Sequence, residues 1–199
     1  MSPAPFALRA SRVLGAAVLV PRPIGDLRGD FVRMADFAWM ADQGLPLPIA
    51  QINGSRSLFA GTLRGLHAQR PPAAEIKLVR CVRGAVFDVW VDLRPDSPSF
   101  GAWDGVVLDA EARLQAYVPA GCAHGYLTLQ DGAEVSYTVS APYAPDLGLA
   151  LAFDDPAVGI DWPAPVRHLS ERDRENPRLA QLRPQLEALR GLMSGGPPG

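Results

Sequence analysis

The sequence predicts an all-β fold, a sandwich or barrel of short strands, and three observations support this prediction. The chain of 199 residues contains 19 glycines and 20 prolines, which are spread along it rather than clustered, except at the very end. Short runs that alternate between apolar and polar residues lie between them. Turn-forming sequences separate these runs. Strands spaced in this way are typical of all-β sandwiches and barrels.

The clearest strand spans residues 85–93, where every second side chain forms an apolar face and Asp88 and Asp92 lie on the other face. Before it, residues 61–69 and 76–81 also have the composition of strands. After it, similar runs are found at residues 113–118, 122–129 and 133–139. The turns between these runs are marked by residues 83–84, 94–98, 119–121 and 130–132.

Helices are expected to be few. Residues 34–43 predict a short helix that ends at Gly44. Residues 177–193 predict a C-terminal helix with Pro177 near its start, where proline is tolerated. Pro184 is expected to kink or divide this helix, because proline lacks the backbone donor that a helix interior needs. Residues 194–199 are expected to be a flexible tail.

Composition excludes several classes of function. The 19 basic and 21 acidic residues give a net charge of −2, so we expect neither nucleic acid nor an anionic membrane as a partner. Cys81 and Cys122 are far apart and predict free thiols in a reducing compartment. The apolar run at 13–20 is too short for a signal peptide or a spanning helix. We therefore expect a soluble, cytoplasmic protein.

The most informative segment is residues 61–69, because it places three polar side chains in a strand. Arg64, His67 and Gln69 stand where a buried strand prefers aliphatic residues, and polar groups are costly to bury without a partner. Either this strand faces water or it lines a site for a polar ligand. Arg64 and His67 are three residues apart, so a regular strand would place them on opposite faces. A bulge at Gly65 would bring both to one side.

Three further residues have the chemistry of a site, and each also has a purely structural interpretation. Lys77 shares a strand face with Val79 and Cys81, and a buried lysine requires a carboxylate or a developing oxyanion. His124 follows a Pro/Gly-rich turn, where it either anchors the turn or binds a ligand. Tyr137 is either a core tyrosine or an acid. His67 itself has a near-neutral pKa in isolation, which suits proton transfer.

A metal site is the main rival interpretation for a histidine-bearing β protein. The chain has three histidines, His67, His124 and His168, but no His-x-His pair and no glutamate at a ligand-like spacing. We therefore expect no metal, although three distant histidines could still converge in the fold.

A series of motifs extends in one order from Asp26 to Asp173. They are Asp26-Leu-Arg-Gly29, Gln51-Ile-Asn-Gly-Ser-Arg-Ser57, Leu63-Arg-Gly-Leu-His-Ala-Gln69, Lys77-Leu-Val-Arg80, Pro119-Ala-Gly-Cys-Ala-His-Gly125, Tyr143-Ala-Pro145, Asp161-Trp-Pro163 and Leu169-Ser-Glu-Arg-Asp173. Together they resemble the dTDP-4-dehydrorhamnose 3,5-epimerase family, the cofactor-free sugar epimerases of the cupin class. The resemblance implies a cupin-type jelly roll of antiparallel strands with a few short helices. We expect a jelly-roll domain at 1–176, followed by a helical extension with a flexible tail at 177–199.

The resemblance also implies an activity and a set of site residues. The substrate would be a nucleotide-linked 4-keto-6-deoxyhexose, inverted at carbon 3, carbon 5 or both, without any cofactor, by a homodimer. His67 would be the base, Asp173 would orient it, Lys77 would stabilise the enolate and Tyr137 would be the acid. The residues expected near the substrate are Arg28, Gln51, Asn53, Arg64, His124, Tyr143 and Trp162.

The chain departs from the family pattern at four places. Ala68 replaces an aromatic residue, Glu75 a glutamine and Cys122 a phenylalanine. The stretch Asp146-Leu-Gly148 lacks the acidic residue that is usual a few positions after the Tyr-x-Pro motif. These departures remove no proposed catalytic group, but they leave the identity of the substrate and the choice of inverted carbons open. The alternatives are a mono-epimerase acting on carbon 3 or 5 of a different nucleotide sugar, a metal-dependent cupin enzyme, and a non-catalytic module that binds sugar nucleotides.

Overall fold

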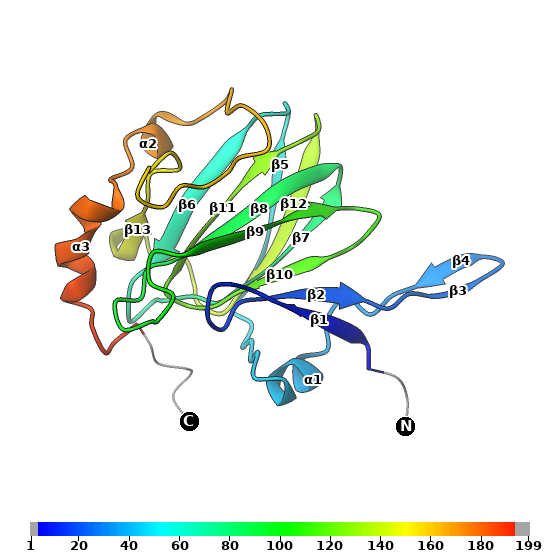
Figure 1. The fold of residues 1–199 in the computed structure, drawn as a ribbon. Coiled ribbons are helices and arrows are strands. Elements are labelled where there is room, and N and C mark those ends of the chain that lie inside the picture. Colours follow the sequence, from blue (N-terminus) through cyan, green and yellow to red (C-terminus); the bar gives the residue numbers. More distant parts are fainter. Residues whose placement is uncertain (1–3, 194–199) are drawn as a thin grey trace.

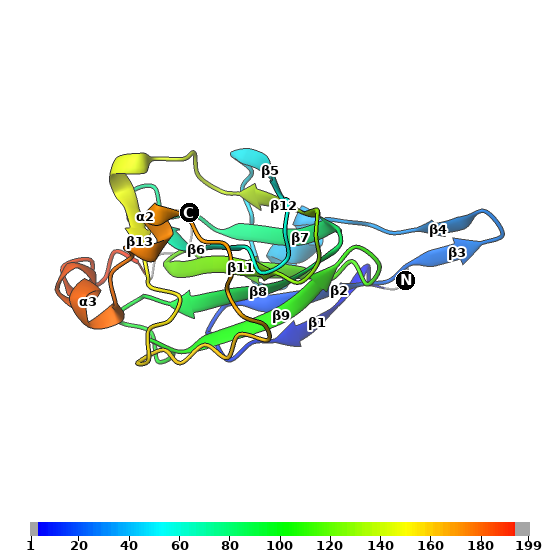
Figure 2. The ribbon, with the colours of Figure 1, turned by 90° about the horizontal axis from the view of Figure 1, so that it is seen from above.

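The structure is a computed structural model that describes residues 4–193, so the flexible tail predicted at 194–199 lies outside the described residues. Two antiparallel β-sheets face each other (Figures 1 and 2). The larger sheet has six strands in the order β1 (Phe6–Ala10), β2 (Ala17–Pro21), β10 (Gln115–Val118), β7 (Lys77–Arg83), β12 (Ala133–Val139) and β5 (Gln51–Ser57). The second sheet has five strands in the order β13 (Gly148–Ala150), β6 (Leu63–Gln69), β11 (Cys122–Thr128), β8 (Ala85–Asp92) and β9 (Trp103–Asp109).

The main core lies between these two sheets. Val79 of β7 and Val135 of β12 meet Val86 and Trp90 of β8 there, and all four are buried. Strands that are neighbours in a sheet are mostly distant in sequence, as in a jelly roll. The predicted all-β class and the six predicted strands are therefore confirmed, with shifts of one or two residues at their ends.

Each sheet is also covered on its outer face. Helix α3 (Leu179–Glu187) packs Leu182 and Leu186 against the five-stranded sheet. Helix α1 (Phe37–Asp42) packs Met40 against the six-stranded sheet, and the Asp36 side chain caps it by accepting a hydrogen bond from the backbone of Trp39 at 3.1 Å. The short helix predicted at 34–43 is confirmed, but the C-terminal helix is shorter than predicted. The chain leaves the helix after Glu187 and continues in turns, and Pro184 lies inside the helix without dividing it.

A two-stranded hairpin projects from the body (Figures 1 and 2). It consists of β3 (Ile24–Asp26) and β4 (Gly29–Phe31), which pair only with each other. Ile24, Leu27 and Phe31 are exposed on it, and Leu27 is fully accessible. An apolar surface of this kind on a projecting element is typical of a contact with another chain.

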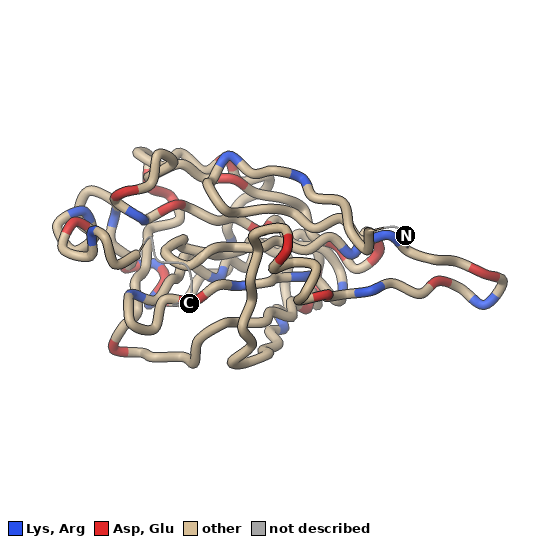
Figure 3. The backbone as a smooth tube through the Cα atoms, turned by 90° about the horizontal axis from the view of Figure 1, so that it is seen from below, with Lys and Arg blue, Asp and Glu red and all other residues tan. Residues whose placement is uncertain are grey.

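Charges of both signs are interspersed along the chain (Figure 3). No large region of one sign is seen from this side, which agrees with the net charge of −2. Over residues 4–193, no helix has the length and apolarity needed to cross a membrane.

Candidate active site

Two adjoining cavities lie between the sheets, and both are lined by His67, Lys77 and Tyr137. The first cavity has a volume of about 480 Å³ and the second about 450 Å³. The first is also lined by Ser55, Thr62, Leu63, Arg64, His124, Tyr126, His168, Leu169, Ser170 and Asp173. The second is also lined by Gln51, Asn53, Ala68, Gln69, Glu75, Val139, Tyr143, Gly148, Leu149 and Arg172. The three shared residues therefore mark the junction at which a ligand that spans both cavities would be contacted from several sides.

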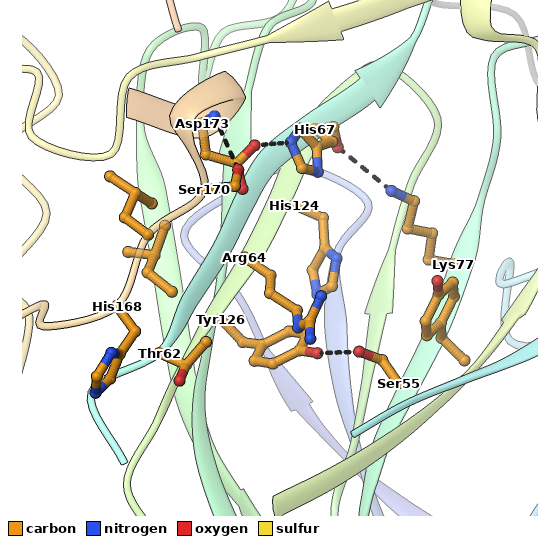
Figure 4. A pocket seen from close by; sticks show the side chains of 13 residues that line it. Ser55, Thr62, Arg64, His67, Lys77, His124, Tyr126, His168, Ser170 and Asp173 are labelled. Carbon is orange, nitrogen blue, oxygen red and sulfur yellow. Dashed lines mark hydrogen bonds and ion pairs between the residues drawn. The ribbon is translucent and has the colours of Figure 1, made fainter. Parts of the chain in front are cut away.

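His67 faces the cavities because of the alternation along β6. Its neighbour Leu66 points to the opposite face, where it joins the core beneath α3. The Nε2 atom of His67 lies 2.6 Å from Oδ1 of Asp173, which is buried. Figure 4 shows the imidazole between this carboxylate and the cavity. Asp173 therefore fixes the ring and leaves the other ring nitrogen for a ligand.

Asp173 is delivered by the four-residue helix α2 (Glu171–Arg174), which contacts β6. The Ser170 hydroxyl caps this helix by accepting a hydrogen bond from the backbone N–H of Asp173 at 3.1 Å. The cap and the His67 pairing hold the carboxylate from two directions. The sequence positions of the histidine and the carboxylate are 106 residues apart.

The environment of His67 favours the neutral ring. Burial lowers the pKa of His67 below its ordinary value of 6.5, even though 42 % of the side-chain surface still faces the cavity. Asp173 acts in the opposite direction, and the positive charges of Lys77 and Arg172 lower the pKa further. The imidazole is therefore neutral near pH 7 and able to accept a proton.

A bulge at Gly65 brings Arg64 to the same cavity as His67, as predicted. Between these strands, a step of two residues on β11, from His124 to Tyr126, matches a step of three on β6. Gly65 has a φ of +133°, and a Cβ atom there would lie 2.6 Å from the Cα of Gly125. Only glycine can occupy this crossing without displacing the backbone.

Lys77 lies on the inner face of β7, with 10 % of its side chain exposed. Its Nζ is 3.0 Å from Oε1 of Glu75 and 3.3 Å from the carbonyl oxygen of His67. Figure 4 shows the amine directed toward the His67 strand across the cavity. Lys77 therefore presents a fixed positive charge beside the imidazole.

Two further hydrogen-bonded pairs shape the first cavity. His124 Nε2 lies 2.8 Å from Oδ2 of Asp88, which is completely buried, so the carboxylate sets the orientation of this second imidazole. The Tyr126 hydroxyl donates to the Ser55 hydroxyl at 2.9 Å. The first pair links the neighbouring strands β11 and β8, and the second links β11 to β5 of the other sheet. Both pairs therefore keep the cavity wall rigid.

Tyr137 is the only tyrosine that lines both cavities among the described residues. Burial raises the pKa of Tyr137 above 10.0, the negative charge of Glu75 raises it further, and Arg64 lowers it. Its phenol is therefore protonated at neutral pH and can donate a proton. The junction thus combines a neutral base, a cation and a phenolic acid, which is the equipment for moving a proton on and off a carbon next to a carbonyl.

Comparison with known proteins agrees with this combination. The family model described as dTDP-4-dehydrorhamnose 3,5-epimerase matches residues 10–181, most of the chain. The chain belongs to the dTDP-4-dehydrorhamnose 3,5-epimerase family. A family member from Sinorhizobium fredii is 45 % identical over 163 residues, which cover 81 % of this chain and 84 % of that protein.

Two solved structures of this family carry nucleotide sugars. The 3,5-epimerase of Legionella pneumophila in complex with dTDP-4-keto-L-rhamnose has a TM-score of 0.84 and 33 % identity, covering 91 % of this chain and 96 % of that one. ChmJ, a 3′-monoepimerase from Streptomyces bikiniensis in complex with dTDP-quinovose, has a TM-score of 0.80 and 37 % identity, covering 87 % and 89 %. The chain is thus similar to enzymes that differ in the number of carbons they invert.

The structure brings together most of the residues that the epimerase resemblance singled out. Nine of the eleven line one or both cavities: His67, Asp173, Lys77, Tyr137, Arg64, His124, Gln51, Asn53 and Tyr143. Trp162 does not. Its ring packs edge-on against Phe87 at 6.0 Å and its Nε1 donates to the carbonyl of Phe153, so it contributes to the core beneath α3.

Arg28 is the other predicted residue that lies outside both cavities. It is on the projecting hairpin, where its guanidinium pairs with Asp26. Within one chain, this arginine therefore cannot contact a ligand at the junction of the cavities.

Several cavity residues were not predicted. Tyr126 shares a strand face with His124, so alternation alone could have indicated it. Arg172, which immediately precedes Asp173, lines the second cavity. His168 lines the first cavity, and its ring packs against that of Phe59 in a tilted arrangement with the centroids 5.2 Å apart, a contact that no local pattern in the sequence reveals.

The departures from the epimerase pattern concentrate in the second cavity. Ala68, Glu75 and Gly148 all line it. Cys122 instead lies in the main core, where burial strongly raises the pKa of its thiol. No three His, Cys, Asp or Glu side chains within residues 4–193 are grouped so that they could hold a metal ion.

Proposed function

We propose that this chain is an isomerase that epimerises carbons 3 and 5 of a dTDP-linked 4-keto-6-deoxyhexose. One observation carries the proposal: the Asp173-bound imidazole of His67 shares a cavity junction with the Lys77 ammonium and the Tyr137 phenol. Membership of the family supports the reaction type. The nucleotide sugars in the two solved relatives support the substrate class.

The chemistry follows from the substrate and these four groups. The ketone at carbon 4 acidifies the hydrogens on carbons 3 and 5. His67 removes one of these protons. The electron pair of the broken C–H bond forms a double bond to carbon 4, and the electrons of the C=O bond move onto the ketone oxygen to give an enolate. The Asp173 carboxylate supports the imidazolium that results. The Lys77 ammonium stabilises the enolate oxygen, and Tyr137 returns a proton to the carbon from the opposite face.

The two cavities suit the two parts of such a substrate. Cavities of a few hundred Å³ are typical of sites for small ligands. The sugar would occupy the junction, where the reacting groups lie. Arg64 in the first cavity and Arg172 in the second are candidates for the diphosphate, because guanidinium groups bind phosphate with two parallel hydrogen bonds. Gln51, Asn53 and Tyr143 offer further polar contacts.

We also propose that the protein is a homodimer and that Arg28 acts in the partner's site. The projecting hairpin exposes Ile24, Leu27 and Phe31, which is costly in water and favourable at an interface. Arg28 at its tip lies outside the cavities of its own chain, so a role with substrate requires a second chain. A cytoplasmic location is proposed from the two buried free thiols, Cys81 and Cys122.

The test is proton NMR of dTDP-4-keto-6-deoxyglucose with the protein in heavy water. We expect deuterium to enter both carbon 3 and carbon 5. Exchange at carbon 3 alone would support a mono-epimerase, the second candidate, which the similarity to the 3′-monoepimerase ChmJ favours. Absence of exchange at either carbon would contradict the proposed function.

The roles of the acid and the base can be separated in the same assay. The Tyr137→Phe variant is expected to retain deuterium exchange, because His67 still removes the proton, but to lose inversion. His67→Ala is expected to lose both. If Tyr137→Phe inverted the substrate normally, the acid would have to be another group.

A further inference from the structure

Glu75 places a nearly buried carboxylate in the wall of the second cavity. Its side chain is 12 % exposed. Oε1 lies 3.0 Å from Nζ of Lys77, and Oε2 lies 3.4 Å from Nε2 of Gln69. A buried charge is costly unless its neighbours require it, so its presence beside a proposed catalytic lysine needs an explanation.

The carboxylate is held in a frame of hydrogen bonds. The Gln69 amide donates to the carbonyl of Pro142 at 3.1 Å and accepts from the backbone N–H of Ala144 at 2.6 Å. The residue after Glu75, Ile76, donates its backbone N–H to the Ser140 hydroxyl at 2.7 Å. The segment that carries Glu75 is thus tied to the strand end at 139–144. The position of its carboxylate is fixed by the fold.

Lys77 depends on this carboxylate. In the part of the chain that the structure describes, Nζ has two polar partners, the Glu75 carboxylate and the His67 carbonyl. An ammonium group has three N–H donors, so these two partners leave it able to donate to a ligand oxygen as well. The ion pair with Glu75 and the hydrogen bond to the His67 carbonyl hold the ammonium beside the imidazole.

We infer that Glu75 is a positioning residue for the epimerisation: its carboxylate holds the Lys77 ammonium toward the enolate oxygen and sets the charge around Tyr137. The inference rests on the proposed function. The influence of Glu75 on Tyr137 supports it, because this carboxylate is the largest contribution after burial that raises the pKa of the phenol. The other titratable or charged groups that line the two cavities are Arg64, His67, Lys77, His124, Tyr126, Tyr143, His168, Arg172 and Asp173.

The two effects can be separated by two substitutions. Glu75→Gln keeps the shape and the oxygen that contacts Lys77 but removes the charge. Glu75→Ala removes both. If the carboxylate positions Lys77, the alanine variant loses more activity than the glutamine variant. If its charge keeps Tyr137 protonated, the glutamine variant loses activity at a lower alkaline pH than the parent protein does.

The experiment measures kcat and KM against pH for turnover of dTDP-4-keto-6-deoxyglucose. Glu75→Gln is expected to keep kcat near neutral pH but to shift the alkaline limb of the kcat–pH profile to lower pH. Glu75→Asp is expected to leave this limb in place. Glu75→Ala is expected to lower kcat by up to about 100-fold with a smaller change in KM. Glu111→Gln, an exposed glutamate in the turn after β9, is the control and should behave as the parent protein.

An unchanged alkaline limb in Glu75→Gln together with an unchanged kcat in Glu75→Ala would overturn the inference. If the alanine variant does not fold, as shown by its melting temperature, the alkaline limb of the isosteric glutamine variant decides alone. Failure of the parent protein to exchange or turn over the substrate would instead refute the proposed function, and the inference with it.

Discussion

The protonation state of His67 is decided by opposing influences at the scale of single residues. Burial and the positive charges of Lys77 and Arg172 favour the neutral ring, whereas Asp173 favours the imidazolium. The imidazole of the His67–Asp173 pair is therefore neutral before the reaction and free to accept a proton from the substrate. The same carboxylate both orients the base and stabilises the charge that it gains during the reaction.

Removal of the Asp173 charge is therefore expected to have two effects. Asp173→Asn should lower kcat by roughly 10³- to 10⁴-fold, because the imidazolium loses its support. It should also move the acidic limb of kcat/KM to lower pH. Asp173 raises the pKa of His67, so without it the ring stays neutral in more acidic solution.

The measurement is kcat/KM between pH 4 and 8 in the parent and variant proteins. Asp155→Asn is the matched control, since Asp155 is equally buried but caps the backbone of Leu179 outside both cavities. An acidic limb that does not move in Asp173→Asn would show that His67 is not the group that limits the rate in acid.

At the scale of elements, the crossing of β6 and β11 determines the site. Gly65 and Gly125 approach so closely that a Cβ on Gly125 would lie 2.6 Å from the carbonyl oxygen of Arg64. This contact creates the bulge that turns Arg64 and His67 to one cavity. The backbone, rather than any side-chain interaction, therefore sets the relation between these two residues.

Gly65→Ala is expected to disrupt both stability and activity. A φ of +133° alone costs about 1–3 kcal/mol for a residue with a Cβ, and the clash with Gly125 adds to this. Gly29→Ala, at a φ of +130° and with no atom within 4 Å of its Cβ, isolates the cost of the φ angle. Chemical denaturation of both variants gives the difference between their free energies of unfolding. Equal losses of unfolding free energy would contradict a steric role for the crossing.

The packing of α3 on the five-stranded sheet is a second feature at this scale. Leu186 is completely buried in the core that includes Leu66, the neighbour of His67. The helix therefore stabilises the face of β6 opposite to the site, although none of its own residues lines a cavity.

Leu186→Ala is expected to lower the free energy of unfolding by about 2–5 kcal/mol, because it removes buried methyl groups and leaves a cavity. The exposed Leu192 provides the control, and Leu192→Ala should change stability by less than about 0.5 kcal/mol. Urea denaturation measures both. A small loss in Leu186→Ala would mean that α3 contributes little to the fold.

At the scale of the whole molecule, the hairpin is the one element among the described residues that projects from the body. Its exposed apolar residues and the position of Arg28 are explained together if it reaches a partner. A C2 dimer would exchange two such hairpins symmetrically, so that each site contains residues of both chains.

Mixing two inactive variants tests this arrangement. His67→Ala and Arg28→Ala proteins are each expected to have low activity, whereas dimers formed by random exchange should recover about a quarter of the parent activity. Half of the dimers are then mixed, and each contains one intact site. Light scattering should give the mass of a dimer. Activity no greater than that of the separate variants would contradict a shared site.

Much of the site could be predicted because the side-chain period of a strand is two. Alternation placed Lys77 with Val79 and Cys81 on an inner face, and His124 with Tyr126 on another, as the structure has them. The bulge at Gly65 was also predictable, since glycine between two polar residues of a strand is itself a local signal.

The sequence by itself therefore determined the all-β class, the faces of the strands and the chemistry of the inward side chains, because these depend on local pattern. Tertiary structure alone decided that Trp162 packs against the core and that Arg28 stands on a projecting hairpin, although the resemblance to the family expected both near the substrate. The resemblance had already paired Asp173 with His67, and the structure brings their atoms to 2.6 Å. Contacts between residues far apart in the chain arise only when the sheets close on each other, and no local pattern encodes that closure.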